Sequence, residues 1–191
     1  RKLKIRPRHK RKRPPFSNDQ IKTILNNPEL ELLGPEERWL IYAAAGTGAR
    51  PSELVGLLPS DINVEADIPF ISIKGRKERE LKTSHSERDI PLIGPALEAF
   101  KNMPDGFGKY RDRTDQLTGG LNKFLREKGL LPTERHTLYS FRHSFQDRLL
   151  SVDAPDRVQA DLMGHRFNRP EYGDGPTLEQ KARWMEKAKI K

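Results

Sequence analysis

The sequence contains no cysteine among its 191 residues, and this absence excludes several kinds of site at once. Without thiols the chain cannot form disulfides, iron–sulfur clusters or Cys-ligated zinc sites, and it has no thiolate nucleophile. It also lacks any apolar run of about 18 residues, the length that a transmembrane helix requires. The basic N-terminus is followed by no apolar stretch, so it does not resemble a secretory signal. We therefore expect a cytoplasmic protein with no membrane partner.

Two common cofactor sites are also missing from the sequence. There is no glycine-rich loop of the kind that cradles a nucleotide phosphate, and no carboxylate cluster with the spacing of a magnesium site. His136, His143 and His165 are not placed with a fourth ligand that would complete a metal site. The sequence therefore predicts chemistry that uses no cofactor and no metal.

Positive charge is concentrated at one end of the chain. The sequence has 36 Lys and Arg against 27 Asp and Glu, a formal charge of +9, and nine of the basic residues lie in residues 1–13, which contain no acid. Taking these nine from the 36 leaves 27 basic and 27 acidic residues in the rest of the chain. Such a block is typical of a solvated segment that contacts nucleic acid. We expect residues 1–13 to be a basic tail or interdomain linker, and residues 14–191 to form one domain.

Hydrophobic periodicity and helix-boundary residues predict a mainly α domain. Helices are expected after Ser17 through Leu25 and at residues 35–46, 51–58, 95–102, 115–128, 137–152, 155–163 and 177–190. Between residues 68 and 93 the pattern changes to short β-prone runs at 70–73 and 89–92, on either side of a charged stretch. The fold class is therefore α+β: a helical domain with a small antiparallel sheet of two or three strands near residues 68–93.

An arginine at a helix start forms the first candidate site. Arg50 follows the turn Gly46-Thr47-Gly48, and Glu53 stands three residues later on the same side of the helix. A guanidinium beside the N–H groups of a helix start is suited to binding a phosphate, and Glu53 can hold Arg50 in place. A surface ion pair at i, i+3 is the alternative interpretation.

The segment HTLYSFRHSF, residues 136–145, forms the second candidate site. On a helix its apolar residues form a core stripe, and Tyr139, Arg142 and His143 can share a neighbouring face. An arginine between two polar rings can grip an oxyanion. The alternative is an ordinary amphipathic helix with a polar outer face.

A histidine and a tyrosine complete the candidates. Gly164 in left-handed geometry would end a helix and present His165 immediately beyond it, although a histidine at a helix end often serves only the helix. Tyr172 lies on a glycine-rich turn seven residues later. Its phenol is a weak nucleophile at neutral pH unless cations or a base activate it, and an exposed turn tyrosine is the alternative.

Taken in order, these motifs resemble the catalytic domain of the tyrosine recombinase (phage integrase) family. ARPSEL, a lysine-rich hairpin, SFRHSF, MGH and a tyrosine follow one another along nearly the whole predicted domain. By this resemblance Arg50 is the first family arginine, Glu53 the acid that supports it and Arg142 the second arginine. His165 occupies the family's His/Trp position, and Tyr172 occupies the position of the nucleophile.

The family lysine lies on a β-hairpin, and the position that matches best is Lys82, in the sequence LKT. Its partner strand would be residues 88–92. Lys74 and Lys77 remain candidates because hairpin register cannot be determined from sequence.

The sequence departs from the family pattern at two places. Tyr139 stands where the family usually has His or Lys; tyrosine can donate a hydrogen bond to a phosphate but is a poorer base than histidine at pH 7. His136 or His143 are candidates to compensate. Tyr172 also lies only seven residues after His165, which is closer than the family spacing.

The resemblance implies a site-specific DNA recombinase or integrase that cleaves and rejoins strands through a 3′-phosphotyrosyl intermediate. Tyr172 would attack the phosphate, Arg50, Arg142 and His165 would bind its oxygens, and Lys82 would protonate the departing 5′ oxygen. Double-stranded DNA and other protomers of the same chain, as a tetramer, would be the partners. The family also implies a separate DNA-clamping domain, expected to precede the catalytic one and to lie outside this chain.

Three other functions remain open from the sequence. One is a nicking–closing enzyme like the type IB topoisomerases, and another is a catalytically silent DNA-binding relative. The third is a helical nucleic-acid-binding domain in which residues 1–13 do the binding. The stretch 177–191 is expected to pack in cis or to dock on a neighbouring protomer.

Overall fold

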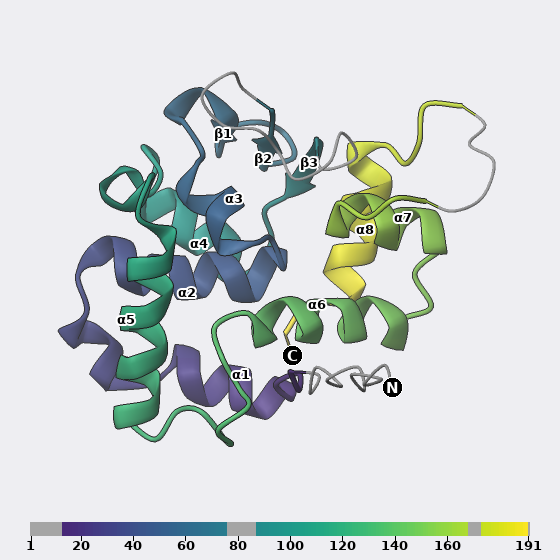
Figure 1. Cartoon of the computed structure of the whole chain (residues 1–191). Coiled ribbons are helices and arrows are strands. Elements are labelled where there is room, and N and C mark those ends of the chain that lie inside the picture. The colour runs from purple at the N-terminus through teal and green to yellow at the C-terminus, as the bar shows by residue number, and fades with distance from the viewer. Residues whose placement is uncertain (1–12, 76–86, 168–172, 191) are drawn as a thin grey trace, which may run out of the picture.

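The computed structural model describes residues 13–75, 87–167 and 173–190 (Figure 1). These residues form eight α-helices: α1 (Asn18–Leu25), α2 (Pro35–Thr47), α3 (Pro51–Val55), α4 (Pro95–Asn102), α5 (Thr114–Glu127), α6 (Ser140–Ser151), α7 (Asp156–Met163) and α8 (Leu178–Lys187). The strands are β1 (Ile62–Asn63), β2 (Phe70–Ile73) and β3 (Arg88–Pro91), and 3₁₀ turns lie at Pro28–Leu32, Pro59–Asp61 and Gly108–Tyr110. Within this described part of the chain, no helix has the length and apolar character needed to cross a membrane.

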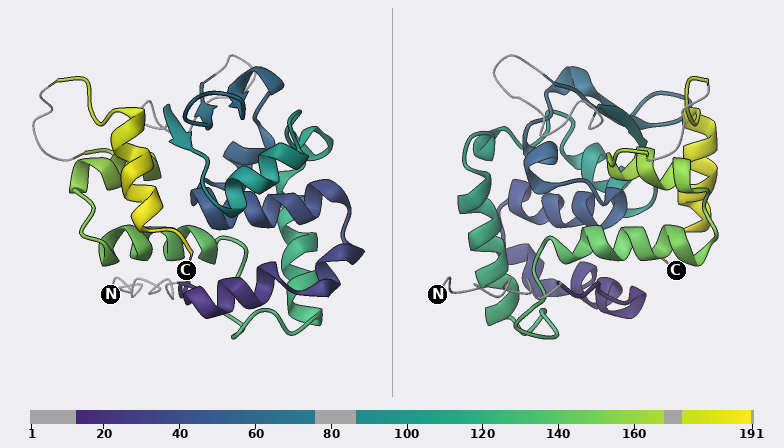
Figure 2. Two further views of the ribbon diagram at one scale, coloured as in Figure 1. Left: turned by 180° about the vertical axis from the view of Figure 1, so that it is seen from behind. Right: turned by 45° about the vertical axis from the view of Figure 1, so that its right-hand side comes forward.

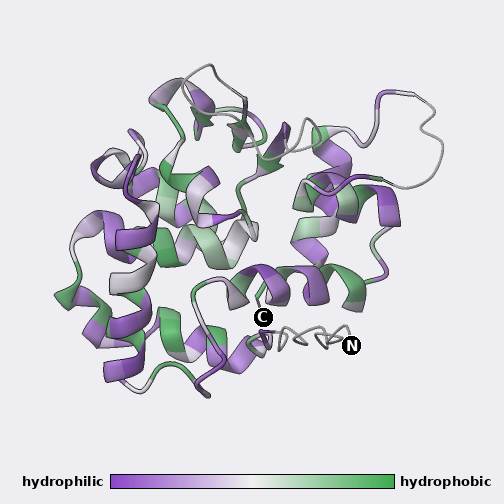
Figure 3. Ribbon diagram, viewed as in Figure 1, coloured by the Kyte–Doolittle hydropathy of each residue, from purple (hydrophilic) through white to green (hydrophobic). Residues whose placement is uncertain are grey.

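Helix α2 forms the centre of the domain. It packs against α1, α3, α4 and α6, and every residue from Trp39 to Thr47 except Tyr42 is buried. A helix that is apolar nearly all round belongs in a core, and in Figure 3 α2 is largely pale to green. Gly46 lets α4 approach closely, since a Cβ there would lie 2.6 Å from Ala96.

The sheet is antiparallel with strand order β1-β2-β3, which confirms the small sheet predicted from the sequence. Ile71 pairs with both Ile62 and Ile90, and Ile73 pairs with Arg88. The third strand, β1, lies before the expected range of residues 68–93 and is short, with only two residues paired to β2. Helices α7 and α8 both contact β3, and Figure 2 shows them beside the sheet.

The predicted helices are present, with shifted ends. Ser17 caps α1 through a capping box, as its sequence predicts. Helix α3 ends at Val55 rather than at residue 58, because the chain turns at Gly56. Helix α6 begins at Ser140, so Tyr139 is its N-terminal flanking residue and not part of the helix.

Helix α8 packs in cis on its own domain. Lys181 donates from Nζ to the Asp89 carbonyl at 2.7 Å and to the Asp161 carboxylate at 2.9 Å. At the other end of the helix, Arg148 donates to the carbonyl of Ala188 at 3.0 Å. Two buried cations therefore attach α8 to β3, α7 and α6.

Candidate active site

The Glu53 carboxylate lies at the centre of the site. Arg50 immediately precedes α3, and its backbone N–H donates to Glu53 Oε2 at 2.8 Å while its Nη1 donates to Oε1 at 2.6 Å. Arg88 from β3 donates to the same two oxygens, from Nη1 at 3.2 Å and from Nη2 at 2.9 Å. The carboxylate therefore accepts four hydrogen bonds, which is close to its full capacity.

These contacts keep Glu53 ionised. Burial alone would raise the pKa of this carboxyl, but the hydrogen bonds and charge of Arg88, together with Arg50, lower the pKa to about 2. The side chain of Glu53 is 4% exposed, that of Arg88 is fully buried, and that of Arg50 is 21% exposed. Of the three, Arg50 has the greatest access to a ligand from solvent.

Arg142 joins the turn before α3 to the end of α7. Its Nη1 donates to the Gly48 carbonyl at 2.9 Å, and its Nη2 donates to the Met163 carbonyl. Burial, and then the charge of Arg50, lowers the pKa of Arg142 to about 10, so it remains a cation at neutral pH. Gly48 must be glycine here, because its φ is +62° and a Cβ would lie 2.5 Å from the Phe145 ring.

His165 stands directly after the left-handed Gly164 that ends α7, in the geometry that its sequence predicts. The residue as a whole is exposed, but its ring is partly buried, and its Nε2 lies 3.1 Å from Arg142 Nη2. Burial, followed by the charges of Arg142, Arg50 and Arg88, lowers its pKa below 6.5. Three segments distant in sequence thus bring Arg50, Arg142 and His165 into one electropositive cluster.

Tyr139, immediately before α6, and His143, in the first turns of α6, lie next to each other. Their rings meet edge to face at 5.6 Å, and the guanidinium of Arg13 lies 5.3 Å from the Tyr139 ring centroid. Partial burial, and then the charge of Arg13, lowers the pKa of His143. Arg13, the last residue of the basic segment 1–13, therefore lies beside Tyr139 of the second candidate site.

His136 has a structural role in this fold. It is buried and stacks on Phe16 with ring centroids 4.9 Å apart. Its Nδ1 lies 2.9 Å from the Thr133 hydroxyl and its Nε2 lies 3.2 Å from the Pro15 carbonyl oxygen. Because both ring nitrogens are engaged in the core, His136 is not available to replace the family's basic residue.

Lys82, Lys77 and Tyr172 fall outside the residues that the structure describes. Lys74 is described and exposed, immediately after β2. The two residues that flank segment 76–86 are joined by a hydrogen bond: the Gly75 N–H donates to Glu87 Oε1 at 2.9 Å.

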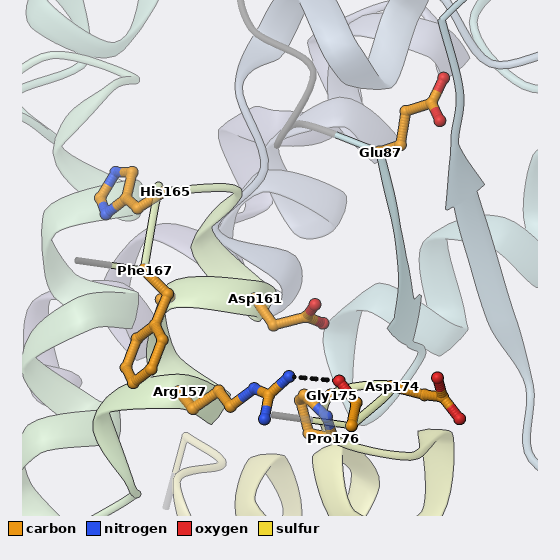
Figure 4. A pocket seen from close by; sticks show the side chains of 10 residues that line it. Glu87, Arg157, Asp161, His165, Phe167, Asp174, Gly175 and Pro176 are labelled. Atoms are coloured by element: carbon orange, nitrogen blue, oxygen red, sulfur yellow. Dashed lines mark hydrogen bonds between the residues drawn. The ribbon is translucent and has the colours of Figure 1, made fainter. Parts of the chain in front are cut away.

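A cavity of about 240 Å³ lies beside His165 (Figure 4). Its lining includes Glu87, at the end of segment 76–86, and Phe167 and Gly173, which flank segment 168–172. Arg157 donates to the Gly173 carbonyl at 2.9 Å. Described residues that flank both segment 76–86 and segment 168–172 therefore line one cavity together with His165. Within residues 13–75, 87–167 and 173–190, no cluster of three or more His, Asp or Glu side chains is arranged to hold a metal.

Sequence reasoning missed one residue of this cluster, Arg88. A signal was present: Arg88, Ile90 and Leu92 alternate along the strand, so they share one face, and the two apolar members are buried. An arginine on the core-facing side of a strand requires a buried partner. The sequence alone does not indicate that this partner is Glu53.

A model of the phage integrase family matches residues 15–169 of the chain. The tyrosine recombinase XerC of Treponema denticola is 30% identical over 142 residues, which cover 66% of this chain and 47% of that protein. The tyrosine recombinase XerA of Pyrococcus furiosus is 28% identical over 139 residues, covering 68% and 46%. The chain thus spans about half the length of these curated relatives.

Solved structures share the fold. The integrase from mycobacterium phage Brujita superposes with a TM-score of 0.69 and 17% identity, over 96% of this chain and 60% of that one. The Tn1549 transposon integrase, solved in complex with transposon right end DNA, gives a TM-score of 0.66 and 19% identity, over 93% and 67%.

Proposed function

Because the chain belongs to the phage integrase family, we propose that it cleaves and rejoins double-stranded DNA as a site-specific recombinase. Residues 14–191 would be the catalytic domain. XerC and XerA, the relatives at 30% and 28% identity, are named tyrosine recombinases, and the Tn1549 integrase was solved with its DNA. The partner would be double-stranded DNA, acted on in the cytoplasm by an assembly of several protomers, four by the family expectation.

Arg50, Arg142 and His165 would hold the scissile phosphate. The support is their convergence: Arg142 lies within 3.1 Å of His165 and reaches back to the turn that carries Arg50. Preorganised cations aimed at non-bridging oxygens stabilise the charge that develops in the transition state. The pKa of His165 is lowered by burial and then by the charges of these same arginines.

Tyr172 would be the nucleophile and Lys82 the general acid. Attack by the phenol oxygen forms a bond to the phosphorus, which stays attached to the 3′ oxygen, and breaks the bond from phosphorus to the 5′ oxygen. The phenol proton leaves to water, and Lys82 supplies a proton to the departing 5′ oxygen. The covalent link conserves the phosphodiester bond energy, so a hydroxyl from another strand can reverse the step without a nucleotide.

The observation that carries this proposal is the convergence of Arg50, Arg142 and His165. The cavity beside His165 adds to it: neither arginine lines this cavity, but residues that flank both segment 76–86 and segment 168–172 do. Along the chain Lys82 is five residues from Glu87 and Tyr172 is one residue from Gly173, so both would be within reach of the same phosphate. The fully satisfied Glu53, which orients Arg50 in the same cluster, supports the proposal independently.

The test is to trap the covalent intermediate without knowing the target site. A pool of nicked duplexes with randomised sequence is incubated with the chain, denaturant-resistant adducts are isolated, and the attached DNA is sequenced. Mass spectrometry of the DNA-linked peptide should identify Tyr172. Tyr172→Phe should form no adduct, and Tyr110→Phe, a tyrosine far along the chain from these motifs, should form it at the wild-type rate. An adduct with Tyr172→Phe would overturn the assignment.

Adduct formation, together with a DNA-binding assay and a plasmid relaxation assay, separates the alternative functions. Binding without adduct indicates a catalytically silent relative, and relaxation of supercoiled plasmid without sequence preference indicates a topoisomerase-like enzyme. If deletion of residues 1–13 removes all binding and the full chain forms no adduct, the protein only binds nucleic acid. For a recombinase, we expect this deletion to weaken both the affinity for DNA and the dependence of that affinity on salt, because nine cationic side chains that can neutralise phosphates are lost.

A further inference from the structure

Arg88 joins two parts of the candidate site that lie far apart in the sequence. One part is the start of α3, where Glu53 holds Arg50; the other is the end of α7, which leads into His165. From β3, Arg88 places Nη1 and Nη2 on the two oxygens of Glu53 at 3.2 and 2.9 Å. Its Nε donates to the Leu162 carbonyl at 3.0 Å. One guanidinium therefore contacts both parts.

We propose that Arg88 is a positioning residue: it holds Arg50, through Glu53, and the turn that carries His165, through Leu162, in one geometry suited to a phosphate. The inference rests on the proposed recombinase function, since the phosphate would be that of DNA. Arg88 itself is fully buried, so it acts through its neighbours and does not touch the substrate.

The contacts require an arginine rather than any cation. Three nitrogens of a planar fork are used on two partners, and a lysine ammonium cannot reproduce that geometry. A buried ion pair is also poor evidence for a stabilising role, because apolar side chains of similar volume often give an equally stable core. A positioning role accounts for the pair instead, because Arg88 and Glu53 hold Arg50 and the end of α7 in a fixed orientation.

The turn at Gly164 packs directly on the guanidinium. Gly164 has φ +59°, and a Cβ there would lie 2.5 Å from Arg88 Nη1. His165 is the next residue, so its backbone position follows any displacement of Arg88. This close packing transmits the orientation of Arg88 to the histidine without a direct contact.

Arg88 and Arg142 act as a pair at the end of α7. Helix C-termini leave carbonyls without partners and carry partial negative charge. Arg88 binds the Leu162 carbonyl and Arg142 binds the next one, Met163. Each also reaches the region around Arg50, Arg88 through Glu53 and Arg142 through Gly48. Arg88 is thus the second of two supports between the same two parts.

The test compares Arg88→Lys with Arg148→Lys. Arg148 is a matched control, because it is also buried, also binds backbone carbonyls, at Ala45 and Ala188, and contacts none of the site residues in those hydrogen bonds. On the adduct-forming substrate, we expect Arg88→Lys to lower the single-turnover cleavage rate by about 100-fold, the effect of a displacement of about 1 Å. DNA affinity should stay near wild type, since contacts along the duplex backbone dominate it.

A second readout does not depend on cleavage. The ring resonances of His165 are followed by NMR while inorganic phosphate is added to the full chain. Wild type and Arg148→Lys should give a saturable shift, and Arg88→Lys should need about tenfold more phosphate, equivalent to about 1.4 kcal/mol of binding energy. If Arg88→Lys does not fold, Glu53→Asp, which keeps the charge but shortens its reach, is measured in its place.

The outcomes are distinct. If Arg88→Lys matches Arg148→Lys in both assays while wild type forms adducts, the positioning role is wrong and the proposed function stands. If wild type forms no adduct but its phosphate response is weakened by Arg88→Lys, the proposed function is wrong and the positioning role stands. If wild type neither forms adducts nor responds to phosphate, both are overturned.

Discussion

Arg142 Nη2 lies 3.1 Å from His165 Nε2, and this contact determines which form of the imidazole the site contains. Arginine has only donors, so Nε2 must accept, and the proton of the neutral ring is then on Nδ1. Burial and the surrounding cations favour the same neutral form. In the proposed site, Nδ1–H is therefore the donor that His165 would offer to a phosphate.

The titration of His165 tests this arrangement. In the protein without DNA we expect its NMR midpoint below 6.5, because burial and then Arg142 disfavour the charged ring. The unfolded chain then binds more protons than the folded one, so the contribution of His165 to stability falls as pH drops through 6.5. Arg142→Gln should raise the midpoint and Arg148→Gln should not. A wild-type midpoint at or above 6.5 contradicts the geometry.

Glu53 should govern stability in acid. Its pKa of about 2 lies below the ordinary 4.5, so the stabilisation is complete above pH 4.5 and is lost as pH falls toward 2. At pH 7, Glu53→Gln should lower the free energy of unfolding by about 3 kcal/mol, because it leaves Arg88 as a buried charge without its carboxylate.

The measurement is urea unfolding at pH 7, 4.5 and 3, and the difference between wild type and Glu53→Gln should narrow as the pH falls. Glu127→Gln is the control. Its exposed pair with Lys123, at 3.8 Å, should contribute less than about 1 kcal/mol at any pH. A gap that stays constant down to pH 3 would contradict the low pKa of Glu53.

Gly48→Ala should destabilise the protein and disturb the site. The left-handed φ of +62° disfavours a side chain, and the new Cβ would clash with Phe145, so we expect a loss of about 1–3 kcal/mol. Gly119→Ala, inside α5 with nothing within 4 Å of the added Cβ, should instead gain about 0.5–1 kcal/mol. Thermal unfolding of both variants measures the two changes in stability. Equal effects would show that the turn before Arg50 is not constrained.

Lys82 can be tested as the general acid by changing the leaving group. Lys82→Ala should cleave an ordinary phosphodiester substrate at least ~100-fold more slowly than wild type. With sulfur in place of the 5′ bridging oxygen the rate should recover, because a thiolate leaves without protonation. Lys74→Ala, from the exposed position after β2, should cleave both substrates normally. Recovery with Lys74→Ala instead would assign the acid to Lys74.

The helices and the small sheet could be predicted from sequence because they follow from local features. The capping box at Ser17, the switch to two-residue periodicity near Phe70 and the left-handed glycine before His165 each specify their own neighbourhood. Element ends were less predictable, as at α3 and α6, because the final turn of a helix depends on what packs against it. The order of the motifs was enough to identify the family.

Contacts between distant segments were decided only in three dimensions. The sequence contains Arg88, Glu53 and Leu162 but does not indicate that one guanidinium joins the other two, since their separation along the chain is 35 and 74 residues. Nor does it show that His136 is held by Phe16 in the core while His165 reaches Arg142. A pattern of residue types determines which chemistry is possible. The packing that buries a charge also dictates its partner, because an arginine removed from water must find acceptors wherever the fold supplies them.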